Sequence, residues 1–157
     1  MQDNPLYEAI VRYSARLLAD SDGARDIAQE VFLRLEQNRS AVQNERAWAY
    51  RAARNLVIDQ LRRSGRFGPM PLDDIPAEAT RFNPVILTER KETLEMLEEK
   101  LNQLSTRHRE VLRLKFQEGL KYAEIADILG ETVTTIAWLI HEAVTKLRKE
   151  FKTADGR

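Results

Sequence analysis

The side chains best suited to bind another molecule are the arginines and aromatic residues between Asn44 and Arg66. Six arginines stand in this stretch against two acids, although the 157-residue chain has a formal net charge of zero. Aromatic rings such as those of Trp48 and Tyr50 stack on bases, while guanidinium groups bind phosphates. This composition is typical of a surface for single-stranded nucleic acid. The residues leave a second interpretation open, in which the rings belong to the core and the arginines lie along the surface.

A second candidate for nucleic-acid binding is the C-terminal stretch from Lys121 to Phe151. Its spacing predicts a short helix over 121–129, a turn at Gly130 and a longer helix that Thr132 caps. The apolar residues of the longer helix recur every three or four positions: Val133, Ile136, Ile140, Val144, Leu147 and Phe151. Two helices joined by a tight turn form the motif that places its second helix in the DNA major groove. A helical hairpin that only packs within the protein is the alternative.

Helix-start signals and amphipathic periodicity predict helices along almost the whole chain. The expected caps are the Asn-Pro pairs at 4–5 and 83–84, Ser21 or Asp22, Asn44, and Ser105. Between Ser64 and Asn83 glycines and prolines interrupt the periodicity and predict an irregular, partly extended linker. We therefore expect an all-α protein with two small helical domains, at 1–66 and 84–157, joined by a flexible linker at 67–83.

The residues indicate neither catalysis nor a cofactor or metal site. The sequence lacks a Walker-type or dinucleotide-binding glycine loop, and His108 and His141 are too far apart for a local zinc motif. Carboxylate pairs such as Asp73 and Asp74 stand among other charges, where solvated surface is the expected role. Cysteine, a leader segment and an apolar run near the roughly 20 residues of a membrane span are all absent. We expect a non-enzymatic cytoplasmic protein without membrane insertion.

Three groups of residues follow one another in a fixed order. They are Asp26, Gln29, Glu30, Phe32 and Leu33; then Trp48, Ala53, Arg54, Asn55, Leu56, Asp59, Leu61, Arg62 and Arg63; and finally Tyr122, Ile125, Ala126, Leu129, Thr135 and Ile136. In this order they resemble the motifs of extracytoplasmic-function (ECF) sigma factors of bacterial RNA polymerase. The resemblance covers nearly the whole chain.

The resemblance implies a promoter-specificity subunit with two helical domains, usually called sigma-two and sigma-four. Its partners would be core RNA polymerase, promoter DNA and an anti-sigma factor. Residues that would dock on the polymerase are Asp26, Gln29, Glu30, Leu33 and Arg34. Residues that would hold and open the −10 element are Trp48, Arg51, Asn55, Asp59, Arg62 and Arg63. Residues that would contact the −35 element are Thr132, Thr134, Thr135, Trp138, His141 and Lys146.

The recognition helix departs from the family pattern because it carries few basic residues. Cations are expected at the places that Ala137, Leu139, Glu142 and Val144 occupy. Each missing cation removes a possible phosphate contact, so we expect a weaker or more apolar −35 contact, which Lys or Arg at 137 and 139 would tighten. Trp138 has two open roles, contact with a thymine methyl and packing against the neighbouring helix, and of these we favour packing. Two other functions stay open: a free-standing helix-turn-helix regulator, and a helical adaptor that binds a protein through this face.

Overall fold

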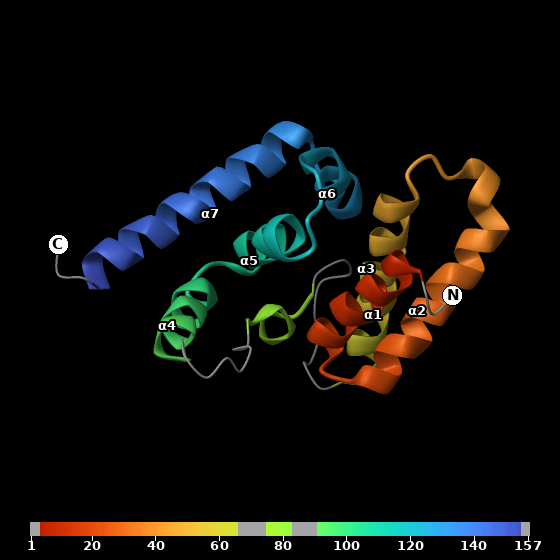
Figure 1. Ribbon diagram of the computed structural model, residues 1–157, viewed down its shortest axis with the longest axis horizontal. Helices are drawn as coiled ribbons and strands as arrows, with labels where there is room; N and C mark the ends of the chain where they lie inside the picture. Colours follow the sequence, from red (N-terminus) through yellow and green to blue (C-terminus); the bar gives the residue numbers. More distant parts are fainter. Residues whose placement is uncertain (1–3, 66–74, 83–90, 155–157) are drawn as a thin grey trace.

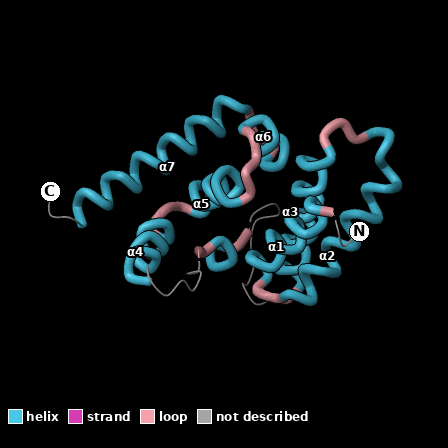
Figure 2. The backbone as a smooth tube through the Cα atoms, in the orientation of Figure 1, coloured by secondary structure: helices cyan, strands magenta, loops and turns pink. Residues whose placement is uncertain are grey.

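The computed structural model describes residues 4–65, 75–82 and 91–154, which form helices and their connections (Figure 1). These described residues contain no strand (Figure 2), in agreement with the predicted all-α class. None of their helices is both long and apolar enough to cross a bilayer. The predicted cap at 83–84 lies outside the described residues.

Three helices form the N-terminal half: α1 (Pro5–Leu18), α2 (Ser21–Asn38) and α3 (Glu45–Arg63). The side chains of Asn4 and Asn44 accept hydrogen bonds from backbone N–H groups in the first turns of α1 and α3, which confirms both caps. The cap of α2 is Asp20, so the prediction of Ser21 or Asp22 was wrong. Ala19 ends α1 in the left-handed conformation, and only Ala19 and Asp20 lie between the two helices, so Asp20 takes the cap position of α2.

The C-terminal half is built from shorter pieces. They are the 3-10 turn η2 (Ala77–Thr80), α4 (Lys91–Asn102), α5 (Thr106–Leu112), the single π-helical turn η3 (Arg113–Gln117), α6 (Tyr122–Leu129) and α7 (Val133–Ala154). Ser105 caps α5, Gly130 ends α6 with a φ of +67°, and Thr132 accepts from the N–H of Thr135. The predicted helix-turn-helix is therefore present as α6 and α7.

The π turn after α5 is a feature that the periodicity did not predict. A regular helix would place Phe116 on the same side as the buried Leu112, four residues earlier, but 66% of Phe116 is exposed. A π turn closes hydrogen bonds over five residues instead of four, so the residues that follow it rotate away from the face of α5. Phe116 is thereby turned to the surface.

One hydrophobic core joins the two halves, because α6 packs against α3 (Figure 1). Fully buried residues from both halves belong to this core, among them Tyr13 and Tyr50 from the first and Leu114 and Ile125 from the second. The rings of Tyr13 and Tyr50 meet edge to face with centroids 5.1 Å apart. In this structure the helix-turn-helix is thus docked on the arginine-rich helix.

The described part of the predicted linker, residues 75–82, is held by two arginines of the C-terminal half. Arg109 donates hydrogen bonds to Thr80 Oγ1 and Ala77 O, both at 3.0 Å, and Arg113 donates to Thr80 O at 3.2 Å. Ile75 and Thr80 are buried. This stretch is therefore a docked turn, which its own composition did not indicate because the arginines that hold it come about thirty residues later.

Candidate nucleic-acid interface

The polar face of α2 collects the residues predicted to bind the polymerase. Asp26, Gln29 and Arg34 are exposed, and Glu30 is half-buried and pairs with Arg34 at 2.8 Å. Leu33 lies on the same side of the helix with 53% of its surface exposed, while the apolar stripe of α2 is buried in the core. Leu33 and the polar residues around it supply the apolar centre and polar rim that a protein-binding surface needs.

The outer face of α3 brings together three of the residues predicted to read the −10 element. Trp48, Arg51 and Asn55 line an open hollow of about 260 Å³, together with Arg34 and Ala52. An indole ring, a guanidinium group and an amide around one hollow offer stacking, charge and hydrogen bonds to an unstacked base.

The structure also distinguishes the two aromatic residues of α3. Tyr50 is 2% exposed and belongs to the core, as the alternative interpretation of this helix held, whereas Trp48 is half-buried beside the hollow.

The remaining −10 candidates lie at the C-terminal end of α3. Asp59 and Arg63 form an ion pair across one helical turn, and Arg62 is half-buried. At 1.5 Å per residue, Arg62 and Arg63 stand roughly 10 Å further along the helix than Asn55. The structure therefore separates these arginines from the hollow.

The recognition helix α7 exposes most of the predicted −35 residues. Thr132, Thr134, His141 and Lys146 are exposed, and Thr135 is half-buried with its hydroxyl bonded to that of Thr132 at 2.9 Å. The favoured packing role of Trp138 was wrong, since 57% of this residue is exposed, and its predicted contact with the −35 element stays open. In a helix, position 138 lies opposite the buried pair Ile136 and Ile140, so Trp138 faces solvent beside His141.

Two of the four positions at which the family pattern has a cation face the interior of the protein. Leu139 is 5% exposed, and the Glu142 carboxylate meets His108 Nε2 of α5 at 2.8 Å. The proposal to place a cation at 139 was therefore wrong, because α5 packs against this side of α7. Ala137 is half-buried and remains a position from which a long cationic side chain can reach DNA.

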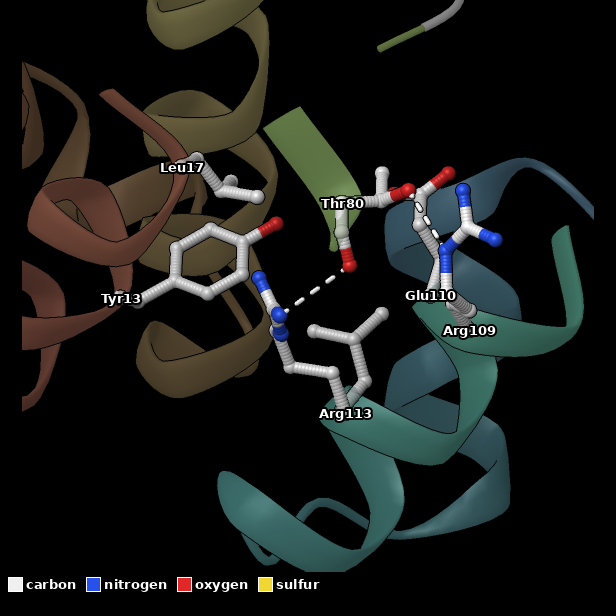
Figure 3. Close-up of a pocket in the computed structure, with 7 residues that line it drawn as sticks. Tyr13, Leu17, Thr80, Arg109, Glu110 and Arg113 are labelled. Carbon is white, nitrogen blue, oxygen red and sulfur yellow. Dashed lines mark hydrogen bonds between the residues drawn. The ribbon is translucent and has the colours of Figure 1, made fainter. Parts of the chain in front are cut away.

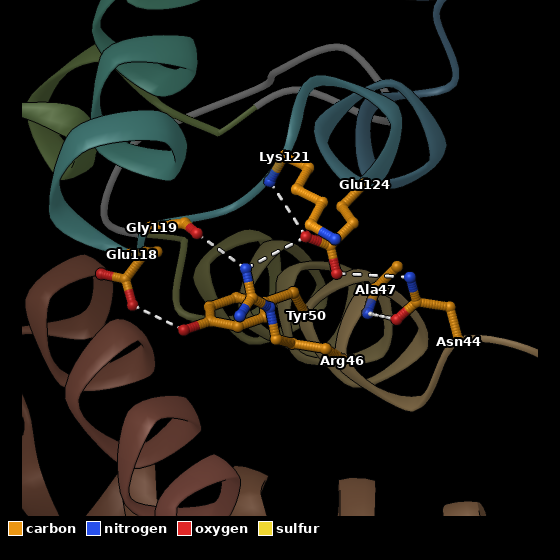
Figure 4. A network of polar contacts seen from close by, with 8 residues as sticks. All are labelled: Asn44, Arg46, Ala47, Tyr50, Glu118, Gly119, Lys121 and Glu124. Atoms are coloured by element: carbon orange, nitrogen blue, oxygen red, sulfur yellow. Dashed lines mark hydrogen bonds and ion pairs between the residues drawn. The ribbon is translucent and has the colours of Figure 1, made fainter.

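Sequence reasoning missed a set of contacts in which carboxylates of the C-terminal half bind groups of α1 and α3. Glu110 accepts two hydrogen bonds from Arg54, and both side chains are about nine-tenths buried. Glu118 accepts from the Tyr50 hydroxyl at 2.7 Å (Figure 4). It also accepts from Arg16 of α1 at 2.6 Å. Burial and the neighbouring Glu118 carboxylate raise the pKa of Tyr50, so Tyr50 remains a neutral donor.

Glu124 makes a third contact of this kind at the start of α6 (Figure 4). Its carboxylate accepts from Arg46 at 3.0 Å, from the Asn44 amide at 3.3 Å and from the N–H of Lys121 at 2.9 Å. Burial by itself raises the pKa of Glu124, but these hydrogen bonds and the charge of Arg46 outweigh burial and lower it. The excess of arginines between Asn44 and Arg66 indicated charged partners for α3, but no spacing in the sequence identified these carboxylates.

A small enclosed hollow lies beside these contacts, between Tyr13, Thr80, Arg109 and Arg113 (Figure 3). Its volume of about 10 Å³ accommodates about one water molecule. Burial lowers the pKa of Arg113, whose hydrogen bonds go to the backbone carbonyls of Thr80 and Arg81. The hollow is too small for a ligand, so we regard it as part of the packing between the halves.

Comparison with known proteins places both halves in one family. Residues 4–67 match the family model described as Sigma-70 region 2, and residues 94–147 match that of Sigma-70, region 4. The chain is 34% identical to the ECF RNA polymerase sigma factor SigL of Mycobacterium tuberculosis, over 87% of this chain and 79% of the relative. It is 28% identical to SigW of Bacillus subtilis, over 92% of this chain and 84% of the relative.

A solved structure shares the fold. The sigma factor RpoE of Bartonella quintana, crystallised with the anti-sigma factor NepR, superposes with a TM-score of 0.61 at 22% identity, over 94% of this chain and 92% of RpoE. The matched regions, the relatives and the motif residues on α2, α3 and α6 all agree. This chain belongs to the extracytoplasmic-function family of RNA polymerase sigma factors.

Proposed function

We propose that this sigma factor binds core RNA polymerase through α2, opens the −10 element with α3 and contacts the −35 element with α7. Residues 1–66 act as the sigma-two domain, residues 84–157 as the sigma-four domain, and 67–83 as the linker between them. The observation that carries the proposal is the hollow lined by Trp48, Arg51 and Asn55 on an exposed face of α3. It stands beside Arg34 of α2, so the DNA-reading and polymerase-facing surfaces are neighbours.

Strand separation in this proposal is driven by binding. The sequence has no Walker-type loop for ATP, so capture of an unstacked base must supply the free energy. The indole of Trp48 stacks on the base, while the amide of Asn55 offers a donor and an acceptor to its edge. Arg62 and Arg63 hold phosphates of the same strand. Stacking contributes about 1–3 kcal/mol per base, which is comparable to the few kcal/mol needed to flip one.

Contact with the −35 element relies on the first turns of α7. The exposed hydroxyl of Thr134 and the remaining backbone N–H groups of the first turn suit phosphate, whereas the Thr132 hydroxyl already donates to Thr135 Oγ1 and accepts from the Thr135 N–H. Trp138 and His141 lie one and two turns further on the exposed side, where an apolar ring can touch a thymine methyl. This arrangement supports a −35 contact that is more apolar than charged.

An anti-sigma factor is the regulatory partner that we propose. The structurally similar RpoE was crystallised with the anti-sigma factor NepR, and most of RpoE's length matches this chain. The exposed apolar residues Leu33, Phe116 and Trp138 supply surface on both halves for such a protein to cover.

Run-off transcription with core polymerase and genomic promoter fragments tests the proposed function. We expect start sites that depend on this protein, and we expect Asn55→Ala to reduce the transcripts by at least tenfold. Gln60→Ala, which removes an exposed amide from the same helix, is the matched control. DNA binding without core polymerase would support the free-standing regulator instead, and binding to neither DNA nor core would support the adaptor.

A further inference from the structure

Four polar side chains connect the interior of the C-terminal half to the exposed face of α7. The Ser105 hydroxyl meets His108 Nδ1 at 2.8 Å, and His108 Nε2 meets Glu142 Oε1 at 2.8 Å. Lys146 Nζ lies 3.5 Å from the same carboxylate oxygen. The exposed fraction of the side chain rises from 7% at His108 to 30% at Glu142 and 53% at Lys146. A buried imidazole thus contacts a carboxylate at the edge of the surface.

Glu142 lies within the surface of α7 that the proposed function assigns to the −35 element. Trp138, Glu142 and Lys146 are spaced four residues apart and therefore follow one another along one side of the helix. A carboxylate at this place repels a DNA backbone unless a cation offsets its charge. The Glu142 carboxylate must therefore be held back or neutralised before α7 can approach phosphate.

His108 and Lys146 share this carboxylate, but their contacts differ. The contact with His108 is the shorter one, and it joins α7 to a buried side chain of α5. The contact with Lys146 is an ion pair across one turn of the same helix, and such exposed pairs are weak. His108 therefore holds the carboxylate towards α5 and leaves the Lys146 ammonium available to phosphate.

The imidazole fits this place in both of its charge states. In the neutral ring the partners assign the proton to Nε2, which donates to Glu142, while Nδ1 accepts from the Ser105 hydroxyl. In the charged ring Nδ1–H donates to Ser105 Oγ, whose own proton turns to solvent because Ser105 is exposed. Imidazole gains its proton within the physiological pH range. One proton therefore adds a positive charge beside Glu142 without a change in packing.

Other charged groups on α5 and on the elements packed against it contact different partners. Arg107 pairs with Glu131, Glu110 with Arg54, Arg109 and Arg113 with the backbone of residues 77–81, Glu78 with Arg109, Lys115 with the Tyr122 ring, and Lys100 with Glu150. His141 of α7 is exposed to solvent. Within the described residues, Glu142 is the ionisable group in contact with the His108 ring.

We propose that His108 is a positioning residue for the −35 contact and that it acts through Glu142. Its imidazole holds the carboxylate towards α5 so that Lys146 binds the DNA backbone, and its proton offsets the carboxylate charge. Binding of duplex DNA therefore tightens as His108 becomes charged. This role rests on the proposed function of α7, and it belongs to a residue that does not itself touch DNA.

The pH profile of duplex binding by the full chain tests this role. The chain has two histidines, so His141→Gln leaves His108 as the only one. In this background, a short duplex of mixed sequence should bind about threefold more tightly at pH 6 than at pH 8, the gain expected from about one phosphate contact. Fluorescence anisotropy at constant low salt measures the affinity. His108→Gln, which keeps an N–H donor but does not titrate, should remove the difference.

A control variant on the same helix checks that the profile belongs to His108. Glu150→Gln removes the ion pair of α7 with Lys100 and should keep the pH difference of its His141→Gln parent. Circular dichroism shows whether each variant is folded.

A double-mutant cycle shows whether His108 acts through Glu142. His108→Ala frees the carboxylate to pair with Lys146, so it should weaken duplex binding by the full chain about threefold at pH 7. In a Glu142→Gln background His108→Ala should have no effect, because no charge is left to hold. A merely structural role of His108 would give the same loss in both backgrounds. If His108→Ala does not fold, the pH profile of His108→Gln decides the question.

The outcomes separate this role from the proposed function. Equal pH profiles of His108→Gln and its parent, or an equal loss from His108→Ala in both backgrounds, overturn the positioning role while the sigma function stands. A full chain that binds the duplex at neither pH overturns it as well. Absence of protein-dependent start sites in the run-off assay contradicts the proposed function instead.

Discussion

The guanidinium group of Arg54 binds both carboxylate oxygens of Glu110, at 2.8 and 3.1 Å, although 56 residues separate the two in the chain. Only about a tenth of each side chain is exposed. A buried ion pair repays its desolvation only with such bidentate geometry, and removal of one partner leaves the other charge buried. This pair therefore makes the docking of the two halves depend on a charge match as well as on apolar contact.

The Arg54–Glu110 pair predicts a large coupling energy. Glu110→Gln should lower the free energy of unfolding by about 3 kcal/mol, because it leaves the guanidinium without its counter-charge. Adding Arg54→Gln should recover part of the loss. Urea denaturation of the wild type and the three variants completes the double-mutant cycle. Effects that simply add would show that the pair contributes no coupling.

The polymerase-facing role of α2 predicts opposite results for two neighbouring leucines. Leu33 is 53% exposed and Leu35 is 1% exposed. Leu33→Ala should weaken binding to core polymerase by tenfold or more while thermal stability stays the same, since no buried contact is lost. Leu35→Ala should instead destabilise the protein by about 3 kcal/mol, because it leaves a cavity. Native core binding by a folded Leu33→Ala variant would remove α2 from the proposed interface.

The recognition helix offers a similar comparison at two positions that lie two residues apart. Ala137→Lys should add about one phosphate contact and steepen the dependence of log K on log salt for a −35 duplex by about one. Leu139→Lys places an ammonium group where the side chain is 5% exposed and should unfold the C-terminal half. Fluorescence anisotropy over a salt series measures the first effect, and circular dichroism the second. An unchanged slope for Ala137→Lys would mean that α7 does not approach phosphate there.

The lowered pKa of Glu124 predicts that acid weakens the contact between the halves. Partial burial alone would raise this pKa, but the hydrogen bonds from Lys121, Asn44 and Arg46 lower it. The stabilisation from its ionised form is therefore complete above the ordinary glutamate pKa and is lost as pH falls through the lowered value. Glu124→Gln should be less stable than the wild type at pH 7, with a difference that shrinks towards about pH 4. Urea titrations at each pH would reveal a constant difference if the charge played no part.

The hydrogen bonds that Arg109 donates to residues 77–80 predict that another cation cannot replace Arg109. Its guanidinium reaches Thr80 Oγ1, Ala77 O, Asn102 O and Leu104 O at once, and burial lowers the pKa of Arg109. A lysine ammonium cannot span these acceptors, so Arg109→Lys should lower the melting temperature and cost about 2 kcal/mol. Arg107→Lys, at an exposed ion pair on the same helix, should cost less than about 0.5 kcal/mol.

The elements of this protein were predictable because their signals are local. Asn4, Asn44 and Ser105 begin helices by binding N–H groups two or three residues away, and Gly130 ends one through its own backbone angle. The apolar stripe of α2 and its polar opposite face follow from a 3.6-residue period that the sequence displays directly. The helix-turn-helix and the family resemblance are built from the same short-range spacings.

The contacts between elements were not predictable in the same way. Leu139 and Trp138 are adjacent apolar residues, and only the packing of α5 decides that the first is buried and the second exposed. The π turn at Arg113–Gln117 has no signal in the periodicity, and the residues that hold 77–80 lie far along the chain. Tertiary packing overrides local preference at such places.

The sequence alone therefore determined the helices, their polar and apolar faces and the family to which the chain belongs. It showed a basic α3 and acids in the C-terminal half, but many pairings of those charges are compatible with one sequence. Only the tertiary structure selected Glu110 for Arg54 and Glu118 for Tyr50. The physical reason is that charge attraction has no fixed sequence spacing, so a pairing is set only when buried apolar surface brings two particular helix faces together.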